Sequence, residues 1–492
     1  MDIAKAIADV NGKLNSFIWG PVMLVFFILV GLMFTVRTKV FQVSKFGRWM
    51  NATFLAIFKN RKVLRTDDKN AISQFQSLCT ALAATIGTGN IVGVATAIAL
   101  GGPGAVFWMW FSAFLGMMTN YAENTLGIKY RYRDEKGRWV GGAMIYIEKG
   151  LKCKWLAVIF SVFCALASFG IGNMTQANSI ASGLADNFFP NAKTLGHIFT
   201  SMEPGSMLSD VNLAAVIIGI VIMAFVALVI LGGIKRIASV TEKFVPFMAV
   251  FYVIGGLIII LVNANRVPAA FGLIFKEAFN FNAGAGGIAG YGIAMAARRG
   301  ISRGVFSNEA GLGSSVMVHS ASDVEEPVVQ GMWGIFEVFA DTIIVCSITA
   351  LSILASGVYD FEAYNAVGGA GLASGAALTS GAFATVFGSF GGKFVSIAIM
   401  LFAFSTILGW SYYGERAVQY LLGLKAVTPY KIIFIAAILV GCTLSLGLVW
   451  DIADTLNGFM AVPNLIAITL LSGQVVKMTK DYLNRGKPGL GP

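Results

Sequence analysis

Two adjacent hydroxyl side chains, Ser405 and Thr406, lie in the middle of an apolar stretch, residues 393–417 (KFVSIAIMLFAFSTILGWSYYGERA). Hydroxyl oxygens are neutral ligands for a hard cation, and they bind one without burying an unpaired carboxylate. We therefore consider both residues candidate ligands of a monovalent cation. The alternative is that each hydroxyl bonds a carbonyl group of its own helix.

A second candidate feature is the sequence IGTGN inside the apolar stretch 79–102. Here Gly87 and Gly89 flank Thr88, and Asn90 follows. An unwound turn exposes N–H and C=O groups, which is costly in hydrocarbon unless those groups line a cavity and bind something. The stretch is therefore predicted to be a broken membrane helix at a binding site. The alternative is that the glycines serve close packing between helices.

The sequence offers no constellation of residues for catalysis. His197 and His319 are far apart, and the five cysteines (79, 153, 164, 346 and 442) form no C-x-x-C pair. The motifs H-E-x-x-H, G-x-S-x-G and G-x-x-x-x-G-K-[ST] are absent from the sequence. We therefore expect neither an enzyme nor an organic cofactor.

The composition is that of an all-α polytopic membrane protein. Of the 492 residues, 57% are hydrophobic and 12% are charged, and the mean hydropathy is +0.75. A soluble protein would carry about twice that charged fraction. We therefore expect the lipid bilayer as a partner, and the net charge of +11 is assigned to cytoplasmic loops rather than to nucleic acid. Eleven spans are expected, at 17–36, 75–100, 104–124, 154–185, 211–232, 241–263, 283–299, 329–355, 391–411, 431–450 and 455–475.

Basic and poorly charged loops alternate along the chain. Residues 37–70 and 125–154 are rich in Lys and Arg. The loop 186–210 has one Lys and three acids, and the loop 356–392 has no basic residue. Because cytoplasmic loops carry the excess of Lys and Arg, we expect a multi-pass cell-membrane protein with its N-terminus outside and its C-terminus in the cytoplasm.

An amphipathic segment follows the first span. Residues 45–60 (KFGRWMNATFLAIFKN) place large apolar side chains on one helical face, with Lys45, Arg48 and Lys59 off that face. This pattern predicts a helix lying in the cytoplasmic interface. The first span and this helix together form a predicted N-terminal region, residues 1–74.

One other expected span, 283–299, is rich in glycine in its interior. When the first span is set aside, the two broken spans are the first and the sixth of ten, so the chain divides into two halves of five helices with opposite topology. In secondary transporters, paired broken spans in inverted halves indicate a binding site at the membrane midplane. The predicted units are a first repeat at 75–263, a second repeat at 264–475 and a cytoplasmic tail at 476–492.

The broken spans predict how a substrate is held. A half-helix that starts near Asn90 directs its N-terminal N–H groups and the positive end of its dipole at a carboxylate. No Arg or Lys lies in the middle of an expected span, so we expect backbone groups rather than an arginine to bind that carboxylate. The residues expected at the substrate from the two broken spans are Thr85, Gly87, Thr88, Gly89, Asn90, Gly286, Gly287, Ile288 and Gly290.

The stretches TIGTGNIVG (85–93) and RRGISRGVFSNEAGLGSS (298–315) resemble the alanine or glycine:cation symporter family, a member of the amino acid–polyamine–organocation superfamily. The resemblance covers essentially the whole chain, including the extra first span. It implies the leucine-transporter fold, a five-helix inverted repeat here preceded by one extra helix. It also implies symport of small neutral amino acids such as alanine and glycine with Na⁺ or H⁺.

The same resemblance implies a sodium site between the first and the eighth core helices. In the superfamily, its ligands are two carbonyl groups just before the break, one carbonyl group of the eighth helix, and two hydroxyls three and four residues farther on. By that spacing the implied ligands in this sequence are Ala83 O, Ile86 O, Phe402 O, Ser405 Oγ and Thr406 Oγ1.

Two further elements supply candidate substrate contacts. Phe169, Asn173 and Gln176 follow one another at i, i+4 and i+7, and polar amides within a span usually face the bundle interior. The alternative for the two amides is hydrogen bonding between helices. Trp410 lies about one turn beyond Thr406, and by the superfamily's spacing it faces the substrate side chain, where an indole leaves room for little more than a methyl group. The alternative is a tryptophan of the interfacial belt.

Asp341 lies mid-span, and an acid within the membrane is a functional candidate by default. It could carry a proton, form a second cation site or pair with a basic residue, and we favour a role in coupling or gating. Glu309 is expected at the cytoplasmic gate, paired with an arginine. The predicted function is cation-coupled symport by a chain that works as a monomer. The alternatives are an ion channel or pore, and a proton-coupled transporter of another small zwitterion.

Overall fold

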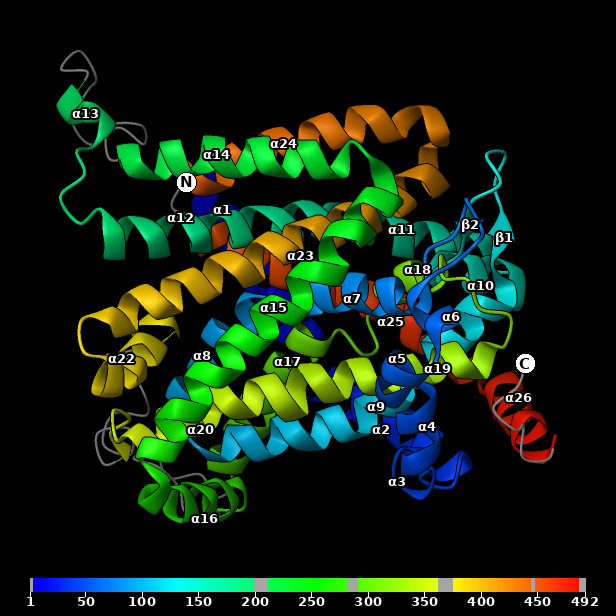
Figure 1. Ribbon diagram of the computed structural model, residues 1–492, viewed down its shortest axis with the longest axis horizontal. Helices are drawn as coiled ribbons and strands as arrows, with labels where there is room; N and C mark the ends of the chain where they lie inside the picture. Colours follow the sequence, from blue (N-terminus) through cyan, green and yellow to red (C-terminus); the bar gives the residue numbers. More distant parts are fainter. Residues whose placement is uncertain (1–2, 199–210, 281–290, 362–374, 444–446, 486–492) are drawn as a thin grey trace.

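The computed structural model describes residues 3–198, 211–280, 291–361, 375–443 and 447–485. Helices account for nearly all secondary structure in these ranges (Figure 1). The strands found there are one short antiparallel pair, β1 (Tyr132–Arg133) and β2 (Trp139–Val140).

Six helices precede the first broken span. The segment 45–60 is not one continuous amphipathic helix, because Thr53 (φ −118°, ψ −99°) interrupts it. Trp49 is buried, and the ring of Phe54 stacks on Phe336 with 5.6 Å between centroids, so this segment packs against the bundle. The six helices are α1 (Ile3–Ile18), α2 (Pro21–Arg37), α3 (Phe41–Ser44), α4 (Phe46–Ala52), α5 (Phe54–Lys59) and α6 (Arg61–Leu64).

The next part of the chain begins at a capping box. Ser73 Oγ accepts from Gln76 N–H, and Gln76 Oε1 accepts from Ser73 N–H, so the first orphan donors of α7 are satisfied. The elements are α7 (Gln74–Thr85), η1 (Gly89–Gly93), α8 (Val94–Gly101), α9 (Gly104–Tyr130), α10 (Ala143–Leu151), α11 (Lys154–Phe169), η2 (Gly170–Met174), α12 (Thr175–Phe188), α13 (Leu195–Ile198), α14 (Leu213–Ile230) and α15 (Gly233–Val262). Of these, η1 and η2 are turns of π-helix.

The remaining elements form the last part of the chain. They are η3 (Ala264–Arg266), α16 (Val267–Ala278), α17 (Tyr291–Asn308), α18 (Val316–His319), α19 (Pro327–Val338), η4 (Phe339–Cys346), α20 (Ser347–Ser356), α22 (Gly375–Phe387), α23 (Phe390–Leu422), η5 (Leu424–Ala426), α24 (Val427–Thr443), α25 (Gly447–Leu470) and α26 (Ser472–Asn484). η4 is a π-helical segment, whereas η3 and η5 are 3₁₀ turns.

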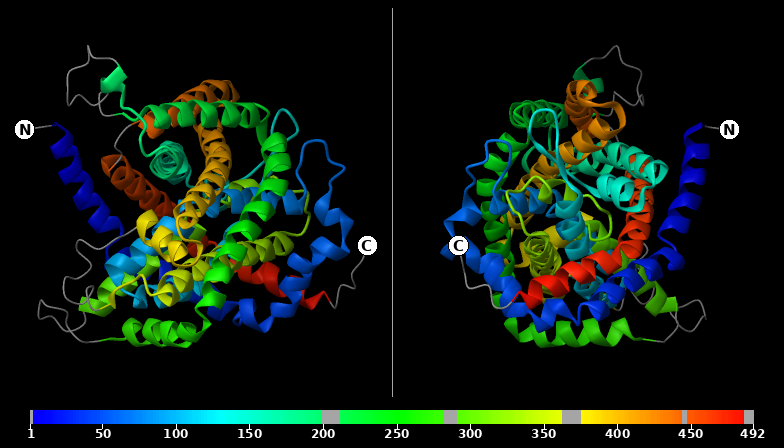
Figure 2. Two further views of the ribbon diagram at one scale, coloured as in Figure 1. Left: turned by 60° about the vertical axis from the view of Figure 1, so that its left-hand side comes forward. Right: turned by 90° about the vertical axis from the view of Figure 1, so that its right-hand side faces the viewer.

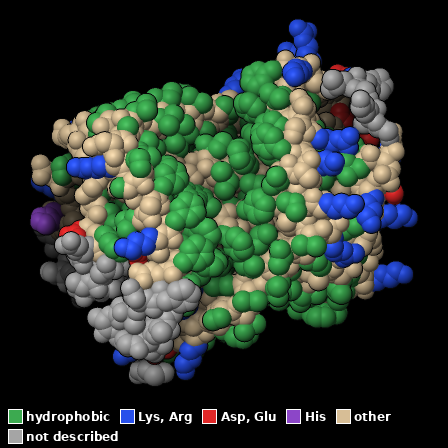
Figure 3. All heavy atoms as spheres, turned by 90° about the horizontal axis from the view of Figure 1, so that it is seen from below, with side chains coloured by type: hydrophobic (Ala, Val, Ile, Leu, Met, Phe, Trp, Pro, Cys, Tyr) green, Lys and Arg blue, Asp and Glu red, His purple; other side chains and the backbone are tan. Residues whose placement is uncertain are grey.

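The helices are built to cross a membrane. Within the described ranges, seven helical segments are long and apolar enough to span one, and two bent pairs bring the number to nine. Among the described residues, helices coincide with ten of the eleven expected spans and with the described part of the seventh, 291–299. Figure 3 shows hydrophobic side chains over the middle of the molecule, with Lys and Arg gathered toward one end. The chain is therefore an all-α polytopic membrane protein.

The centre of the bundle is organised around α9, which packs along both α17 and α19. The turn into α9 requires glycine at Gly102 (φ 72°), and Gly104 lets the start of α9 approach the backbone of α16 closely. The extra helix α1 lies at the outside of this bundle, against α25 (Figure 2). The chain is interrupted at 86–88, between α7 and η1, and at 309–315, between α17 and α18, and the residues of both segments are buried.

Candidate substrate and ion site

The first broken helix unwinds where the sequence IGTGN predicts. α7 ends at Thr85, Ile86 is extended (φ −75°, ψ 91°), and η1 begins at Gly89. The two halves, Gln74–Thr85 and Gly89–Gly101, are bent by 50° relative to each other. The predicted break is confirmed.

Side-chain and backbone acceptors of the protein already bind several N–H groups of this break. Gly87 N donates to Asn90 Oδ1 (2.9 Å), and Thr88 N donates to Gln176 Oε1 (3.4 Å). Asn90 N donates to Gly87 O (3.3 Å). Of the three N–H groups expected to bind a carboxylate, at Thr88, Gly89 and Asn90, two therefore already have acceptors within the protein. The physical reason is that a donor left open in an apolar bundle is costly, so the fold supplies its own acceptors.

A second break was predicted in 283–299 from its glycines; residues 283–290 lie outside the described residues, and the rest of that span is helical. α17 continues as a helix to Asn308 and α18 begins at Val316, so the chain unwinds over 309–315, EAGLGSS. Three residues of this segment have left-handed backbone conformations: Glu309 (φ 57°), Gly311 (φ 95°) and Gly313 (φ 73°). Four residues expected at the substrate lie outside the described residues: Gly286, Gly287, Ile288 and Gly290.

Asp341 joins the two broken helices. Asn90 Nδ2 donates to Asp341 Oδ1 (2.7 Å), while Ser307 Oγ (2.9 Å) and Thr342 Oγ1 (2.7 Å) donate to Asp341 Oδ2. All four side chains are buried. The contacts described for this carboxylate are hydrogen bonds from neutral groups, so the expected alternative of pairing with a basic residue has no support among the described residues.

The implied sodium ligands gather between α23 and the first break. Thr406 Oγ1 lies 3.5 Å from Ile86 O and 3.1 Å from Phe402 O, and Ser405 Oγ lies 2.8 Å from Phe402 O. Ala83 is buried in the last turns of α7. Both hydroxyls thus bond a carbonyl of their own helix, as the alternative interpretation expected. A hydroxyl that donates one hydrogen still has lone pairs to offer a cation.

Close packing sets the distance between the break and α23. A Cβ on Gly87 would lie 2.5 Å from Thr406 Oγ1, so glycine allows this approach. Ser405 Oγ also contacts the sulfur of Met248 on α15 at 3.3 Å. Thr406 therefore reaches the break directly, whereas Ser405 lies between α23 and α15.

The residues expected on one face of the third core helix separate in the structure. The π-helical turn η2 lies between Phe169 and Gln176 and changes the helical register. Asn173 Nδ2 donates to Phe434 O (2.6 Å), and the ring of Phe169 packs against Phe434, so both residues face α24. Gln176 alone reaches the first break, through Thr88 N–H. The interhelical alternative therefore describes Asn173, whereas Gln176 lies at the candidate site. At the end of α7, Thr85 Oγ1 bonds Ala81 O (3.3 Å).

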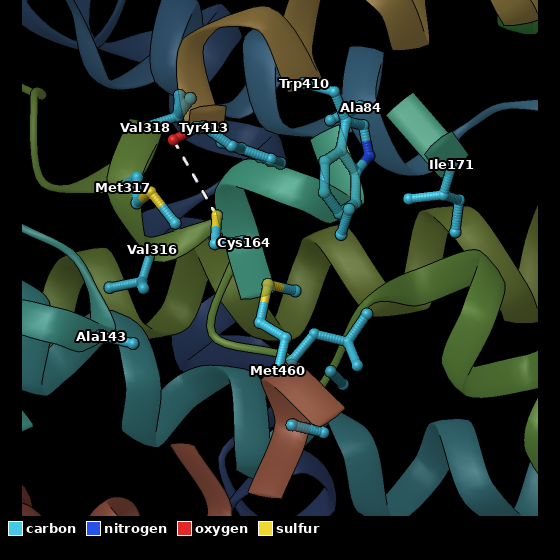
Figure 4. Close-up of a cluster of buried hydrophobic side chains, with 14 of the residues drawn as sticks. Ala84, Ala143, Cys164, Ile171, Val316, Met317, Val318, Trp410, Tyr413 and Met460 are labelled. Atoms are coloured by element: carbon cyan, nitrogen blue, oxygen red, sulfur yellow. Dashed lines mark hydrogen bonds between the residues drawn. The ribbon is translucent and has the colours of Figure 1, made fainter. Parts of the chain in front are cut away.

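Trp410 lies in the interior and not in an interfacial belt, because it is 1% exposed. Figure 4 shows it in the buried cluster with Ala84 and Ile171. Its Nε1 donates to Glu309 Oε1 (2.8 Å), and Ser314 Oγ donates to Glu309 Oε2 (2.5 Å). Glu309 is thus placed at the second break and holds the indole, instead of pairing with an arginine at a cytoplasmic gate.

A cavity of about 230 Å³ lies beside the first break. Thr88 and Gly89 form part of its wall, and so does Arg303 of α17. Arg303 lies beyond the expected seventh span, 283–299, but within α17, which continues to Asn308. Ser307 and Arg303 were therefore missed as site residues, although both lie in the stretch 298–315 that carries the resemblance most specifically. The sequence signal that would have found them is the pair of glycines in EAGLG (309–313). Both glycines have left-handed backbone conformations just after α17 ends.

Comparison with known proteins places the chain among transporters. A family model described as "Sodium:alanine symporter family" matches residues 4–492. The chain is 46% identical over 486 residues to "Sodium/alanine symporter AgcS" of Methanococcus maripaludis, with 98% of each chain covered. It is 36% identical over 490 residues to "Probable sodium/glutamine symporter GlnT" of Bacillus subtilis, with 99% of this chain and 93% of that protein covered.

Among solved structures, the fold is similar to that of MhsT, crystallised in complex with L-phenylalanine. The TM-score is 0.57 at 15% sequence identity, over 84% of this chain and 93% of that one. A likeness at this identity shows the fold alone, and the leucine-transporter fold expected from the sequence is confirmed.

Replacing Ser405 and Thr406 together by Ala removes two of the five implied ligand oxygens. For the wild type, exchanging choline chloride for NaCl should raise the midpoint of thermal unfolding, because a ligand that binds the folded state stabilises it. In the double variant this increase should disappear. Ser411→Ala is the matched control, since Ser411 Oγ bonds Leu408 O (2.7 Å) on the same helix and is not an implied ligand. An increase of wild-type size in the double variant would refute the assignment.

Proposed function

The chain belongs to the sodium:alanine symporter family, and we propose that it couples the uptake of small neutral amino acids, alanine and glycine, to the entry of Na⁺. The observation that carries this proposal is the presence of two unwound segments, 86–88 and 309–315, in the interior of the bundle, linked by Asp341, which accepts from Asn90 after the first segment and from Ser307 before the second. In secondary transporters such paired breaks form the substrate and ion site. Hydroxyls of α23 adjoin the first break, which gives this site a set of ligands suited to Na⁺.

Substrate size is not fixed by family membership, because the names of the two relatives refer to alanine and to glutamine. The packing around Trp410 supports the smaller substrate. The indole is buried against Gly172, whose missing side chain makes room for it, and Glu309 holds its N–H. A large side chain in a fixed orientation leaves little volume for the substrate side chain.

The proposed mechanism is alternating access. A cation between Ile86 O and Thr406 Oγ1 would tie the first broken helix to α23, so ion occupancy would bias the position of one helix against the other. Two side-chain oxygens stabilise the unwound backbone beside this contact. Asn90 Oδ1 accepts from Gly87 N–H, and Gln176 Oε1 accepts from Thr88 N–H. Asp341 would hold charge at the point where the two broken helices meet.

The basic end of the molecule supports an orientation with the N-terminus outside and the C-terminus in the cytoplasm. Both broken helices belong to one chain, which supports function as a monomer. A channel would require a pore-lining filter or a ring of subunits, and the close packing of α23 against α7 speaks against a pore between them.

The test of this function is accumulation. Purified wild-type protein in liposomes should concentrate labelled alanine when an inward Na⁺ gradient is imposed, because symport draws its free energy from that gradient. Collapse of the Na⁺ gradient should return alanine to equilibrium. Accumulation driven by a proton gradient alone would favour the proton-coupled alternative, and equilibration without accumulation under every gradient would favour a pore.

Trp410→Ala should widen the range of substrates. Leucine and glutamine should then compete for bound labelled alanine with an affinity at least about tenfold higher than in the wild type, which is the size of a relieved steric clash. Glycine should bind more weakly, because packing is lost. Trp410→Phe is the control, since it keeps a large ring without the N–H. The pocket assignment fails if leucine and glutamine still do not compete while alanine binds to Trp410→Ala as before.

Asp341→Asn should separate transport from coupling. The amide preserves the size of the side chain and removes its charge, so exchange of external for internal alanine should persist while gradient-driven accumulation falls at least about tenfold. Glu337→Gln provides the control, because Glu337 is a second buried carboxylate on the preceding helical turns, bonded to His319 and Asn120. Equal losses in both variants, or full accumulation by Asp341→Asn, would count against a coupling role.

A further inference from the structure

The cavity of about 230 Å³ beside the first break leads outward from the candidate site. A second cavity of about 510 Å³ shares Val92 and Trp450 with it and includes Asp186 near the end of α12. In Figure 1 the end of α12 and α22 lie at the side opposite the basic hairpin β1–β2. The lining of the inner cavity is Thr88, Gly89, Val92, Gly93, Thr96, Arg303, Phe306 and Trp450.

Two residues on the wall of the inner cavity each carry a buried polar atom that has no hydrogen-bond partner among the described residues. These atoms are Thr88 Oγ1 and Arg303 Nε. Buried polar groups are normally hydrogen-bonded. Thr88 is only 1% exposed, whereas the side chain of Arg303 is 22% exposed and is therefore the one that an entering ligand can reach. A planar guanidinium presents paired N–H donors, which suit an anion with two oxygens.

Among the described residues Arg303 forms one ion pair, and that contact is loose; Asp451 is a second acid close enough to interact with Arg303 electrostatically. Arg303 Nη1 lies 3.9 Å from Asp454 Oδ1, whereas a hydrogen-bonded arginine–carboxylate pair is closer, at about 2.7–2.9 Å. The guanidinium also lies over the ring of Phe306, 5.4 Å from its centroid. A carboxylate entering the cavity can therefore compete with Asp454 for the guanidinium.

The extra helix α1 holds Asp454 in place from the other side. Asn15 Nδ2 lies 3.3 Å from Asp454 Oδ2, and Trp19 Nε1 donates to Asp454 O (3.0 Å). Asp454 thus retains a hydrogen-bond donor when Arg303 turns away. This gives the extra first helix a place in the site, because it fixes the acid that competes for Arg303.

We propose that the inner cavity is an outer subsite at which an incoming amino acid docks its carboxylate on Arg303, displacing Asp454, before it passes to the break at Thr88 and Gly89. The planar guanidinium donates both hydrogen bonds to that carboxylate. The subsite selects for a free α-carboxylate on a small molecule. This proposal rests on the proposed function, since it concerns the same substrate on its way to the same site.

The test compares the KM and the maximal rate of sodium-driven alanine uptake by full-length protein in liposomes. Arg303→Gln should raise the KM about tenfold, the loss expected for one hydrogen bond to a charged group, with the maximal rate unchanged. Asp454→Asn should lower the KM, because the competitor is gone. The double variant should match Arg303→Gln, because removing the competitor has no effect once the arginine is absent. Arg298→Gln, on the same helix but not in the cavity wall, should leave the KM unchanged.

Alaninamide supplies a chemical control, because it lacks the carboxylate. It should inhibit uptake by the wild type and by Arg303→Gln equally weakly. An unchanged KM in Arg303→Gln would overturn the subsite, as would additive effects in the double variant. Should Arg303→Gln fail to fold, Asp454→Asn decides alone: an unchanged or raised KM overturns the proposal. If the wild type itself does not accumulate alanine, the proposed function fails. If the wild type accumulates alanine and the variants have the same KM as the wild type, only the subsite fails.

Discussion

Unwound backbone inside an apolar bundle must find polar partners, and this requirement shapes the centre of the protein. Asn90 meets it with both ends of its amide: Oδ1 accepts from Gly87 N–H, and Nδ2 donates to Asp341 Oδ1. One side chain therefore keeps the first helix open and orients the buried carboxylate at its edge. A bundle of this hydrophobicity tolerates the break only because these hydrogen bonds are made within the protein.

The site is assembled from segments that are far apart in the sequence. α7 and η1 bring the first break, α17 brings Ser307 and the second break, η4 brings Asp341, and α23 brings Thr406 and Trp410. Each contributes one or two contacts, so the geometry of the centre depends on how the helices are placed relative to one another. The 3.5 Å separation of Thr406 Oγ1 and Ile86 O is such a contact between α23 and the first break. A change in the relative position of these elements would open or close it, which is the link that we propose between ion binding and alternating access.

The sequence was informative wherever the chemistry is local. The break at IGTGN follows from glycines and polar residues in an apolar stretch, and the hydroxyls of Ser405 and Thr406 stand out for the same reason. The unwound segment at 309–315 was not predicted, because glycine content alone does not show where a helix ends. Left-handed conformations at Glu309 and Gly311 identify it in the structure. The separation of Phe169 from Gln176 depends on a π-helical turn, which a helical period of 3.6 residues does not anticipate.

The central claim is that the two unwound segments together form the ion and substrate site, and hydrogen–deuterium exchange tests it most directly. Exchange of the wild-type protein would be followed in peptides covering residues 83–93 and 305–316, with Na⁺ and alanine added separately and together. The account predicts that the two ligands together slow exchange in both peptides, because occupancy stabilises both breaks against local opening. Protection confined to other peptides, or to one break while the other exchanges as in the ligand-free protein, would contradict it.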